Sequence, residues 1–287
     1  YRPLAYCRFR NDGGARSALE QIMEYYTEPE KRRPIIGSFD VIVAGGGTAG
    51  VFAALAAARQ GAATALIESK GYTGGIAAEG GTALHSFYNL WKAFPAVEKK
   101  QLVRGIPDEF IRRLYREEGT AGHCEMDGYY DYDSVCTTID TEIYKRVTLE
   151  MLVEAGVRLF LNTQLVDTIM EGNRIAGIIT ESRSGREVIR GKAFVDCTGY
   201  GDLCAQAGAG FTEPNDYPVV NTMALGGVSM EGFRDFLEAN GGLKQLAHGR
   251  RSGKEHQIIR LGGYREKYPE AFQKAAGDLG MSCVTTT

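Results

Sequence analysis

The sequence predicts an α/β fold in which a parallel β-sheet carries an antiparallel β-meander and leads into part of an α+β domain. Three observations support this prediction. An apolar strand at residues 40–44 runs through a glycine turn into a helix of small residues, which is the order of a β–α–β unit. Three short strand patterns separated by turn residues follow at 165–191. After residue 203, short strand patterns mix with helical ones.

The glycine turn has the spacing of a dinucleotide-binding motif. Gly45, Gly47 and Gly50 occupy the three glycine positions of G-x-G-x-x-G. These positions require a sharp turn, room for a pyrophosphate against bare backbone, and close packing of the helix on the strand. The following helix, at residues 48–60, would direct free N–H groups and the positive end of its dipole toward the pyrophosphate. The stretch therefore predicts a Rossmann-like dinucleotide site.

A carboxylate ends the second strand of this unit. The strand at 65–68 closes on Glu68, roughly 20 residues after Gly45, where an acidic residue of such sites accepts a hydrogen bond from a ribose hydroxyl. A strand-end glutamate exposed to solvent and without a role is the alternative. An acidic rather than a basic residue favours a ribose with a free 2′-hydroxyl, and hence NAD or FAD over NADP.

A second glycine-rich loop, at residues 71–81, distinguishes between these two cofactors. In NAD dehydrogenases the second strand leads into another crossover helix, whereas in flavoproteins a loop at this place closes over the pyrophosphate and reaches the flavin. The loop therefore favours FAD, and a plain surface loop is the alternative. Residues 82–89 would emerge on the flavin side, which makes His85 the candidate general acid or base, with a structural histidine as the alternative.

Composition limits the classes of function. The 287 residues are enough for two domains. Charged residues make up 24% of the chain and the net charge is −3, without a dense basic patch, which argues against nucleic acid as a partner. No apolar run reaches the roughly 18–20 residues of a membrane span. Neither nucleic acid nor a membrane span is therefore expected, and the partner expected from the dinucleotide motifs is a small-molecule substrate.

The six cysteines indicate neither a metal site nor a redox pair, because they are scattered and form no C-x-x-C pair. We expect reduced thiols in a cytoplasmic protein, with disulfides or a removed signal peptide as alternatives. The acidic loop at 125–133 lacks the spacing of an EF-hand, so a solvated or substrate-facing loop is expected there and no metal.

The other elements are predicted from periodicity and turn residues. We expect an N-terminal arm at 1–36, a nucleotide-binding domain at 37–202 with an insertion at 82–140, and the start of a substrate domain at 203–287. Expected helices cover residues 17–26, 101–117, 141–155, 231–239 and 270–276, and a loop covers 118–138. Expected strands cover 157–161, the meander at 165–170, 174–180 and 186–191, a separate return strand at 193–196, and 219–225.

Separated places in the chain together resemble one family. They are residues 40–50, Glu68, the pair Gly74-Gly75, the meander, and the segment at 194–208, which begins Phe-Val-Asp-Cys-Thr-Gly-Tyr-Gly-Asp. They resemble FAD-dependent oxidoreductases of the glutathione-reductase-like type with two dinucleotide motifs, related to fumarate reductase and succinate dehydrogenase flavoproteins. The resemblance covers roughly residues 28–230. It implies a Rossmann-like FAD-binding domain followed by part of a substrate domain.

The resemblance also implies a cofactor role for individual residues. The pyrophosphate turn would consist of Gly45, Gly47, Thr48, Ala49 and Gly50. The adenosine side would use Glu68, Ser69, Lys70 and Val166, and the loop along the pyrophosphate and flavin would use Gly75 and Ile76. The segment under the cofactor would use Thr198, Gly199 and Asp202.

Three features depart from the family pattern. Tyr200 stands where the subgroup usually has aspartate, which would alter a surface hydrogen bond or a cofactor contact. Gly74 stands at the place of the histidine that links covalently to the flavin in the succinate dehydrogenase branch, so the resemblance implies non-covalent FAD. The chain ends before the family's C-terminal segment, so we expect a longer protein or a second chain to complete the flavin pocket.

Taken together, these residues predict an FAD-dependent oxidoreductase that transfers a hydride or two electrons between a small organic substrate and non-covalently bound FAD. A flavin-binding subunit without catalytic activity, serving assembly of a larger complex, is the alternative. An NAD-dependent dehydrogenase is disfavoured by the second glycine loop.

Overall fold

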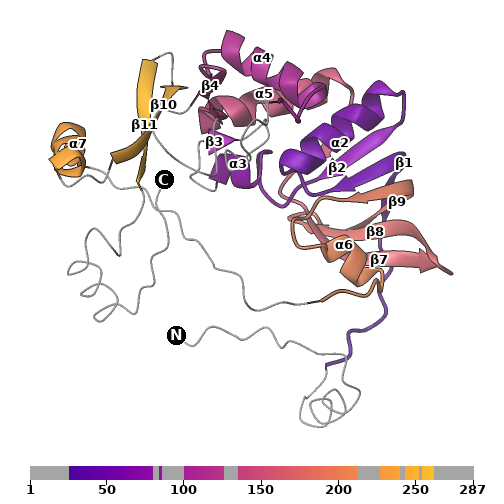
Figure 1. The fold of residues 1–287 in the computed structure, drawn as a ribbon. Helices are drawn as coiled ribbons and strands as arrows, with labels where there is room; N and C mark the ends of the chain where they lie inside the picture. Colours follow the sequence, from indigo (N-terminus) through magenta and orange to yellow (C-terminus); the bar gives the residue numbers. More distant parts are fainter. Residues whose placement is uncertain are drawn as a thin grey trace.

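A computed structural model of the chain describes residues 26–79, 84–85, 100–125, 135–212, 227–239, 243–251 and 254–261. Its centre is a six-stranded sheet in the order β6-β2-β1-β9-β8-β7 (Figure 1). The first four strands of this order are parallel, and β8 and β7 extend the sheet as an antiparallel meander. The strands are β1 (Ile35–Ala44), β2 (Thr64–Ile67), β6 (Arg158–Phe160), β7 (Gln164–Glu171), β8 (Arg174–Ser182) and β9 (Gly185–Asp196). The predicted α/β class is confirmed.

Strand β9 differs from the prediction because it is one continuous strand instead of two. Residues 188–196 pair in parallel with β1, and residues 185–190 pair antiparallel with β8. In the sequence, Gly191 suggests that one strand ends and another begins. In the structure the strand continues, and a Cβ atom at this position would lie 2.8 Å from Cδ1 of Ile42 and 2.9 Å from Cζ of Phe194. Glycine fits the close approach of these two side chains to the strand. Because β9 continues through this position, the meander belongs to the same sheet as β1.

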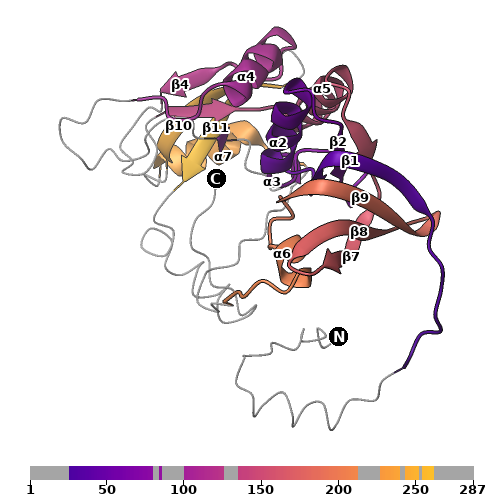
Figure 2. The same ribbon diagram turned by 90° about the vertical axis from the view of Figure 1, so that its right-hand side faces the viewer.

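Three helices lie on one side of the sheet and form the main core with it, and among them α2 packs directly on β1 and β2 (Figures 1 and 2). They are α2 (Thr48–Arg59), α4 (Ile106–Arg116) and α5 (Thr141–Glu154). The ring of Phe110 lies between those of Phe52 and Tyr144, at centroid distances of 5.6 and 4.8 Å. Alternate residues of β1 face the opposite way, and there Ile42 packs with Leu203 of the short helix α6 (Asp202–Gln206).

Local capping sets the helix boundaries. Helix α5 begins after Asp140, whose Oδ1 accepts hydrogen bonds from the N–H groups of Glu142 and Ile143 at 2.9 and 3.1 Å. Helix α4 begins later than predicted, because Gly105 has a φ of 74° and cannot be helical. The predicted helices at 48–60, 141–155 and 231–239 agree with α2, α5 and α7 (Met230–Ala239). The predicted domain boundaries stay predictions, although β1 already begins inside the expected arm.

Two smaller sheets contain strands that the sequence did not indicate. Strands β3 (Leu84–His85), β5 (Val135–Thr138) and β4 (His123–Glu125) form an antiparallel sheet, so the loop prediction for 118–138 is wrong where β4 and β5 lie. Strands β10 (Leu243–Arg251) and β11 (Lys254–Leu261) form a hairpin. Strands as short as β3 to β5 show no periodicity to detect. The predicted helices at 17–26 and 270–276 and the strand at 219–225 lie outside the described residues, Tyr26 excepted.

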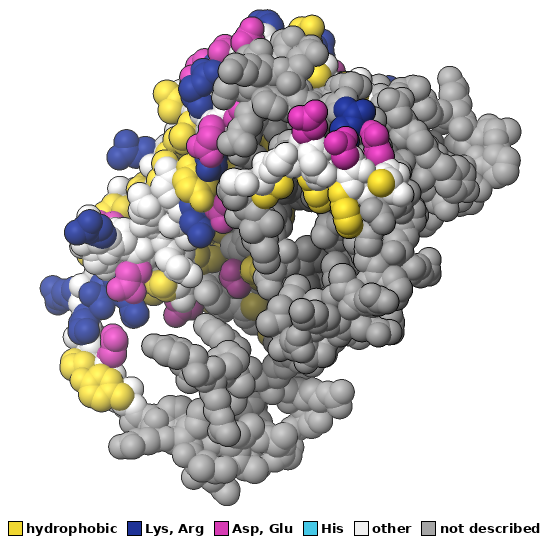
Figure 3. Space-filling view, turned by 90° about the vertical axis from the view of Figure 1, so that its left-hand side faces the viewer, with side chains coloured by type: hydrophobic (Ala, Val, Ile, Leu, Met, Phe, Trp, Pro, Cys, Tyr) yellow, Lys and Arg dark blue, Asp and Glu magenta, His cyan; other side chains and the backbone are white. Residues whose placement is uncertain are grey.

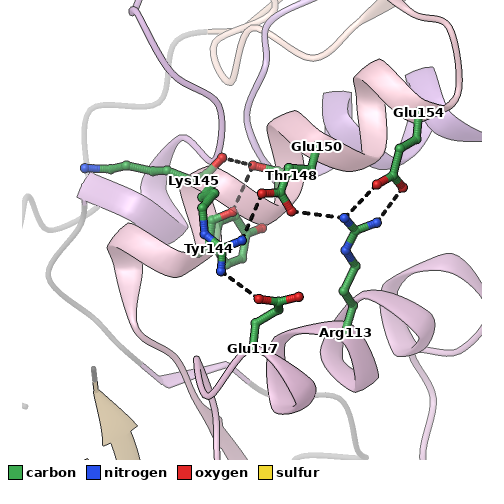
Figure 4. A network of polar contacts seen from close by, with 8 residues as sticks. Arg113, Glu117, Tyr144, Lys145, Thr148, Glu150 and Glu154 are labelled. Carbon is green, nitrogen blue, oxygen red and sulfur yellow. Dashed lines mark hydrogen bonds and ion pairs between the residues drawn. The ribbon is translucent and has the colours of Figure 1, made fainter. Parts of the chain in front are cut away.

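Ion pairs join α4 to α5 at the surface of the main core (Figure 4). The guanidinium of Arg113 donates to both carboxylate oxygens of Glu154, at 2.5 and 2.8 Å, and to Glu150 at 3.0 Å. Arg146 donates to Glu150 at 2.8 Å and to Glu117 at 2.9 Å. The network therefore holds the end of α4 against the middle and end of α5.

The described surface is mixed in charge. On the face drawn in Figure 3, acidic and basic side chains are interspersed over the described part of the molecule. Within the described ranges, no helix has both the length and the apolar character needed to cross a membrane.

Candidate dinucleotide-binding site

A pocket of about 720 Å³ lies at the ends of β1 and β2 and at the start of α2. Segments that are far apart in the sequence line it. They include the predicted residues Gly45, Gly47, Thr48, Ala49, Glu68, Ser69, Lys70, Gly75, Ile76, Thr198, Gly199 and Asp202. Strand β1 pairs with β2 on one side and β9 on the other, so the pocket lies at the point where the strand order reverses. Open α/β sheets bind ligands at such a point.

The first glycine turn leaves no space for a side chain at Gly45 or Gly50. Gly45 has a φ of 97°, and a Cβ atom on it would lie 2.2 Å from the carbonyl oxygen of Cys197. A Cβ atom on Gly50 would lie 1.8 Å from the carbonyl oxygen of Gly45. Gly50 therefore packs behind the turn instead of lining the pocket. The turn, the start of α2 and the end of β9 are in direct backbone contact.

The second glycine loop docks on the first. The N–H of Gly74 donates to the carbonyl oxygen of Gly46 at 2.9 Å, and Gly47 and Gly74 form an isolated parallel β-bridge. A Cβ atom on Gly75 would lie 2.8 Å from Cα of Gly47. Behind the loop, the buried hydroxyls of Thr73 and Thr148 are 2.7 Å apart, which fixes the loop to α5. The two loops thus present bare backbone to the pocket.

The first turn of α2 offers donors to this pocket. Gly47 precedes the helix without a side-chain cap, and the first turn contains no acidic residue. The backbone N–H groups at the start of a helix have no partner within it and carry the positive end of the helix dipole. Thr48 and Ala49 line the pocket at this point. An anionic group such as a pyrophosphate fits this end of the helix.

Glu68 is held rigidly at the end of β2. Its side chain is buried, with Oε2 accepting from the N–H of Gly46 at 2.7 Å. Its Oε1 accepts from the N–H of Lys70 at 2.7 Å and from the hydroxyl of Ser69 at 3.0 Å. A carboxylate has about four acceptor positions, so one more donor, such as a ribose hydroxyl, can be accommodated.

Asp196, at the end of β9, organises the segment that follows it. Its Oδ1 accepts from the N–H and the hydroxyl of Thr198, at 3.1 and 2.7 Å, and its Oδ2 accepts from the N–H of Cys204 at 2.9 Å. The hydroxyl of Thr198 in turn accepts from the N–H of Asp202 at 2.9 Å. Burial alone would raise the pKa of Asp196, but these hydrogen bonds outweigh it and lower the pKa. The sequence alone pointed to no role for this aspartate.

Several pocket residues were not predicted. They are Ile67, Glu79, Thr163, Gln164, Leu165 and Cys197. Tyr200, which the sequence marked only as a departure from the family pattern, lines the pocket as well. The turn before β7 reaches the pocket because the N–H of Thr163 donates to the carbonyl oxygen of Glu68 and that of Asn162 to Lys70. Asn162 has a φ of 50°, a conformation in which asparagine is enriched, and this is the one signal of the turn in the sequence. Val166 is outside the lining, and its cofactor role stays a prediction.

The candidate catalytic histidine lies in the small sheet that follows the second glycine loop. His85 is in β3, opposite Thr137 of β5, and its catalytic role stays a prediction. On the other side of β5, His123 of β4 pairs with the same Thr137. Nδ1 of His123 is 2.6 Å from the hydroxyl of Thr137, and its Nε2 is 3.5 Å from Oδ1 of Asp108.

A second pocket, of about 980 Å³, lies beside α4. Asp108, Arg112 and Tyr115 of that helix line it, together with His123. No residue of the predicted cofactor set contributes to its walls. Among the described residues, no group of three or more histidine, cysteine or acidic side chains could hold a metal ion.

A family model described as FAD dependent oxidoreductase matches residues 40–274. The chain belongs to this family. FAD is therefore the dinucleotide that this family membership indicates, and the resemblance noted in the sequence is confirmed at the level of FAD-dependent oxidoreductases. The glycine turn, the buried carboxylate and the helix start described above fit this cofactor.

Solved structures of other proteins overlap with part of the chain. THI4 of Thermovibrio ammonificans has 18% sequence identity and a TM-score of 0.40, with 59% of this chain and 61% of that chain covered. L-proline dehydrogenase from P. horikoshii has 16% identity and a TM-score of 0.44, with 63% and 58% covered. GidA of Aquifex aeolicus has 22% identity and a TM-score of 0.38, with 55% and 25% covered. The chain thus spans less than two thirds of each of these proteins.

Proposed function

We propose that this chain forms the FAD-binding part of an oxidoreductase that transfers a hydride or two electrons between a small organic substrate and non-covalently bound FAD. The observation that carries the proposal is that separate segments of the chain line one pocket. These segments are the two glycine loops, the start of α2, Glu68 and the residues after Asp196. When bound, FAD supplies the redox chemistry at its own ring, and the protein supplies position and electrostatics.

Each segment has a distinct task in holding the cofactor. The bare backbone at Gly45 and Gly47, with the N–H groups of Thr48 and Ala49, would receive the pyrophosphate. Glu68 would accept from a hydroxyl of the adenosine ribose, because its carboxylate lines the pocket and keeps an acceptor position.

The remaining segments would flank the two ends of the cofactor. Ser69 and Lys70 would lie beside the adenine, with the start of β7. Gly75 and Ile76 would follow the pyrophosphate toward the flavin.

Non-covalent binding is supported by the surroundings of Gly74. Its φ is 124°, and a Cβ atom there would lie 2.8 Å from Cβ of Ala78 and 3.1 Å from the ring of Tyr144. A histidine side chain at this position would collide with both residues. The chain therefore differs from the succinate dehydrogenase branch at the position where that branch forms its covalent link.

We further propose that the chain is related to fumarate reductase and succinate dehydrogenase flavoproteins, on the basis of the paired glycines after Glu68 and the segment at 194–208. A second chain, or a further segment of the same protein, would complete the flavin pocket. A cytoplasmic location is proposed on the basis of the free thiols of Cys124, Cys197 and Cys204. A small organic molecule remains the proposed substrate class.

The absorption spectrum of the purified protein tests the proposal. We expect the two visible bands of an oxidised flavin, present after purification or regained when FAD is added to the apoprotein. Acid precipitation should release the flavin into the supernatant, whereas a yellow pellet would contradict non-covalent binding. A colourless protein that gains no flavin spectrum with added FAD would contradict the proposed function.

Anaerobic titration with candidate substrates tests the redox role. A substrate that bleaches the flavin bands, with recovery on admission of an acceptor, is the expected result. A flavin that is bleached by dithionite but by no member of a broad panel of alcohols, amines and organic acids would count against a catalytic role.

A further inference from the structure

Tyr200 is the most exposed of the large hydrophobic side chains that the structure describes. Its exposed fraction is 92%, although it lines the candidate FAD pocket. A tyrosine ring carries a large apolar area, and leaving it in water forgoes the free energy of burial. An exposed aromatic ring at the wall of a ligand pocket is therefore suited to being covered by a ligand.

The loop that carries Tyr200 is shaped to hold the ring outward. Gly199 and Gly201 flank it with φ values of 88° and 78°, so the chain bends on both sides of the tyrosine. The hydrogen bonds from Thr198 and Cys204 to Asp196 fix the base of this loop. The base of the loop is thus fixed before any ligand binds, so that Tyr200 stands at a defined place in the pocket wall.

The loop leads into α6, which packs against β7, the strand whose first residues line the adenosine side of the pocket. The hydroxyl of Thr168 in β7 donates to the carbonyl oxygen of Gln206 at 3.0 Å. The first residues of β7, Gln164 and Leu165, line the same pocket. The turn before them is bonded to Glu68 and Lys70, the residues assigned to the ribose and the adenine.

We propose that Tyr200 is a cofactor-binding residue on whose ring the adenine of FAD stacks. The inference rests on the proposed function, because it requires FAD in this pocket. An aspartate at this position, as in the resembling subgroup, has no aromatic face and adds a negative charge. This chain therefore binds the adenine end through a contact that the subgroup's usual residue does not make.

Titration of the apoprotein with FAD, ADP and FMN tests the proposal, with binding measured by calorimetry. Stacking of a base on an aromatic side chain corresponds to roughly a five- to 150-fold change in Kd on substitution by alanine. We expect Tyr200→Ala to raise the Kd of FAD and of ADP by the same factor within this range. FMN, which lacks adenine, should bind the variant and the wild type equally.

Two further variants separate stacking from other roles. Tyr200→Phe keeps the ring and should keep the Kd of ADP within about twofold of the wild type. Tyr115→Ala removes an exposed tyrosine of α4 outside this pocket and should leave the Kd values of FAD, ADP and FMN unchanged. Circular dichroism melting of each variant verifies that the fold is retained.

The outcomes are distinguishable. Equal Kd values of ADP for Tyr200→Ala and the wild type would overturn the inference and leave the proposed function intact. A loss of FAD affinity without a loss of ADP affinity would also overturn it, because the ring would then contact the flavin half. A wild-type protein that binds neither FAD nor ADP would overturn the proposed function and the inference with it.

Discussion

The carboxylate of Glu68 accepts a hydrogen bond of 2.7 Å from the backbone N–H of Gly46, a residue 22 positions earlier in the chain. The end of the second strand thus holds the turn that follows the first strand. The same carboxylate lines the pocket, where the proposed ribose contact would use its remaining acceptor position. One side chain therefore contributes both to the shape of the glycine turn and to the proposed binding of FAD.

Replacing Glu68 by alanine should affect stability and binding together. The N–H of Gly46 would lose its acceptor in a buried place, which lowers the free energy of unfolding by about 1–3 kcal/mol. The ribose hydroxyl would lose a charged acceptor worth about 1.5–3 kcal/mol, so the Kd of FAD should rise at least tenfold. Thermal melting and FAD titration measure the two effects. Glu171→Gln, at an exposed pair with Arg174, is the matched control and should change neither quantity. Unchanged FAD affinity in Glu68→Ala would contradict the ribose assignment.

Alanine at Gly50 should destabilise the protein even though it lies in a helix. Exchanging glycine for alanine inside a helix normally stabilises it by about 1 kcal/mol. Here the new Cβ atom would lie 1.8 Å from the carbonyl oxygen of Gly45, so the turn or the helix must move. We expect a net loss of about 1–3 kcal/mol in the free energy of unfolding, and weaker FAD binding.

Gly210→Ala is the control for this substitution. A Cβ atom at Gly210 would meet no heavy atom within 4 Å, so we expect a melting temperature close to that of the wild type. A Gly50→Ala variant that is as stable as Gly210→Ala and retains FAD would show that the backbone contact behind the turn is not required.

Asp196 should make the stability of the protein depend on pH. Its pKa in the folded protein is lowered, so its stabilisation is fully present above its pKa in the unfolded chain, about 3.9. The stabilisation is lost as the pH falls through the lower, folded-state value. The melting temperature of Asp196→Asn should therefore lie below that of the wild type at pH 7, and the gap should narrow below about pH 4. A gap of constant size between pH 7 and pH 3 would contradict this role of the carboxylate.

Arg113 should stabilise the protein more than its neighbour Arg112. Arg113 joins α4 to α5 through Glu150 and Glu154 (Figure 4), whereas Arg112 forms an exposed pair with Asp108 on its own helix. We expect Arg113→Ala to lower the free energy of unfolding by about 1 kcal/mol and Arg112→Ala by less than about 0.5 kcal/mol. The loss in Arg113→Ala should shrink in 1 M salt, where the Debye length is about 3 Å. Urea unfolding at two salt concentrations measures this, and equal losses for both variants would contradict the interhelical role.

Much of the candidate site could be predicted from the sequence because its determinants are local. The three glycines of the first turn, the small residues of α2 and the acid after β2 all belong to one short β–α–β unit. Within such a unit, residue spacing and position in space are closely related. Helix α5 was equally predictable, since Asp140 caps it and its apolar residues recur at helical spacing.

The other parts of the site depend on segments that meet only in the fold. The turn before β7 reaches the pocket because it hydrogen-bonds to residues 68 and 70, and its own sequence shows little of this. In the sequence, Gly191 suggested the end of a strand. The close approach of the Ile42 and Phe194 side chains, which explains a glycine at this position, exists only in the packed sheet. The strands β4 and β5 are too short for a period to appear.

The sequence by itself determined the nucleotide-binding unit, the extents of α2 and α5, and the class of cofactor, because backbone geometry and residue spacing constrain these locally. Only the tertiary structure decided that β9 pairs both with β1 of the parallel sheet and with β8 of the meander. It also decided that Glu68 accepts a hydrogen bond from Gly46, and that Asp196 fixes the base of the loop that carries Tyr200 at the pocket. These relationships are distances between atoms brought together by burial and hydrogen bonding, and no local pattern in the chain encodes them.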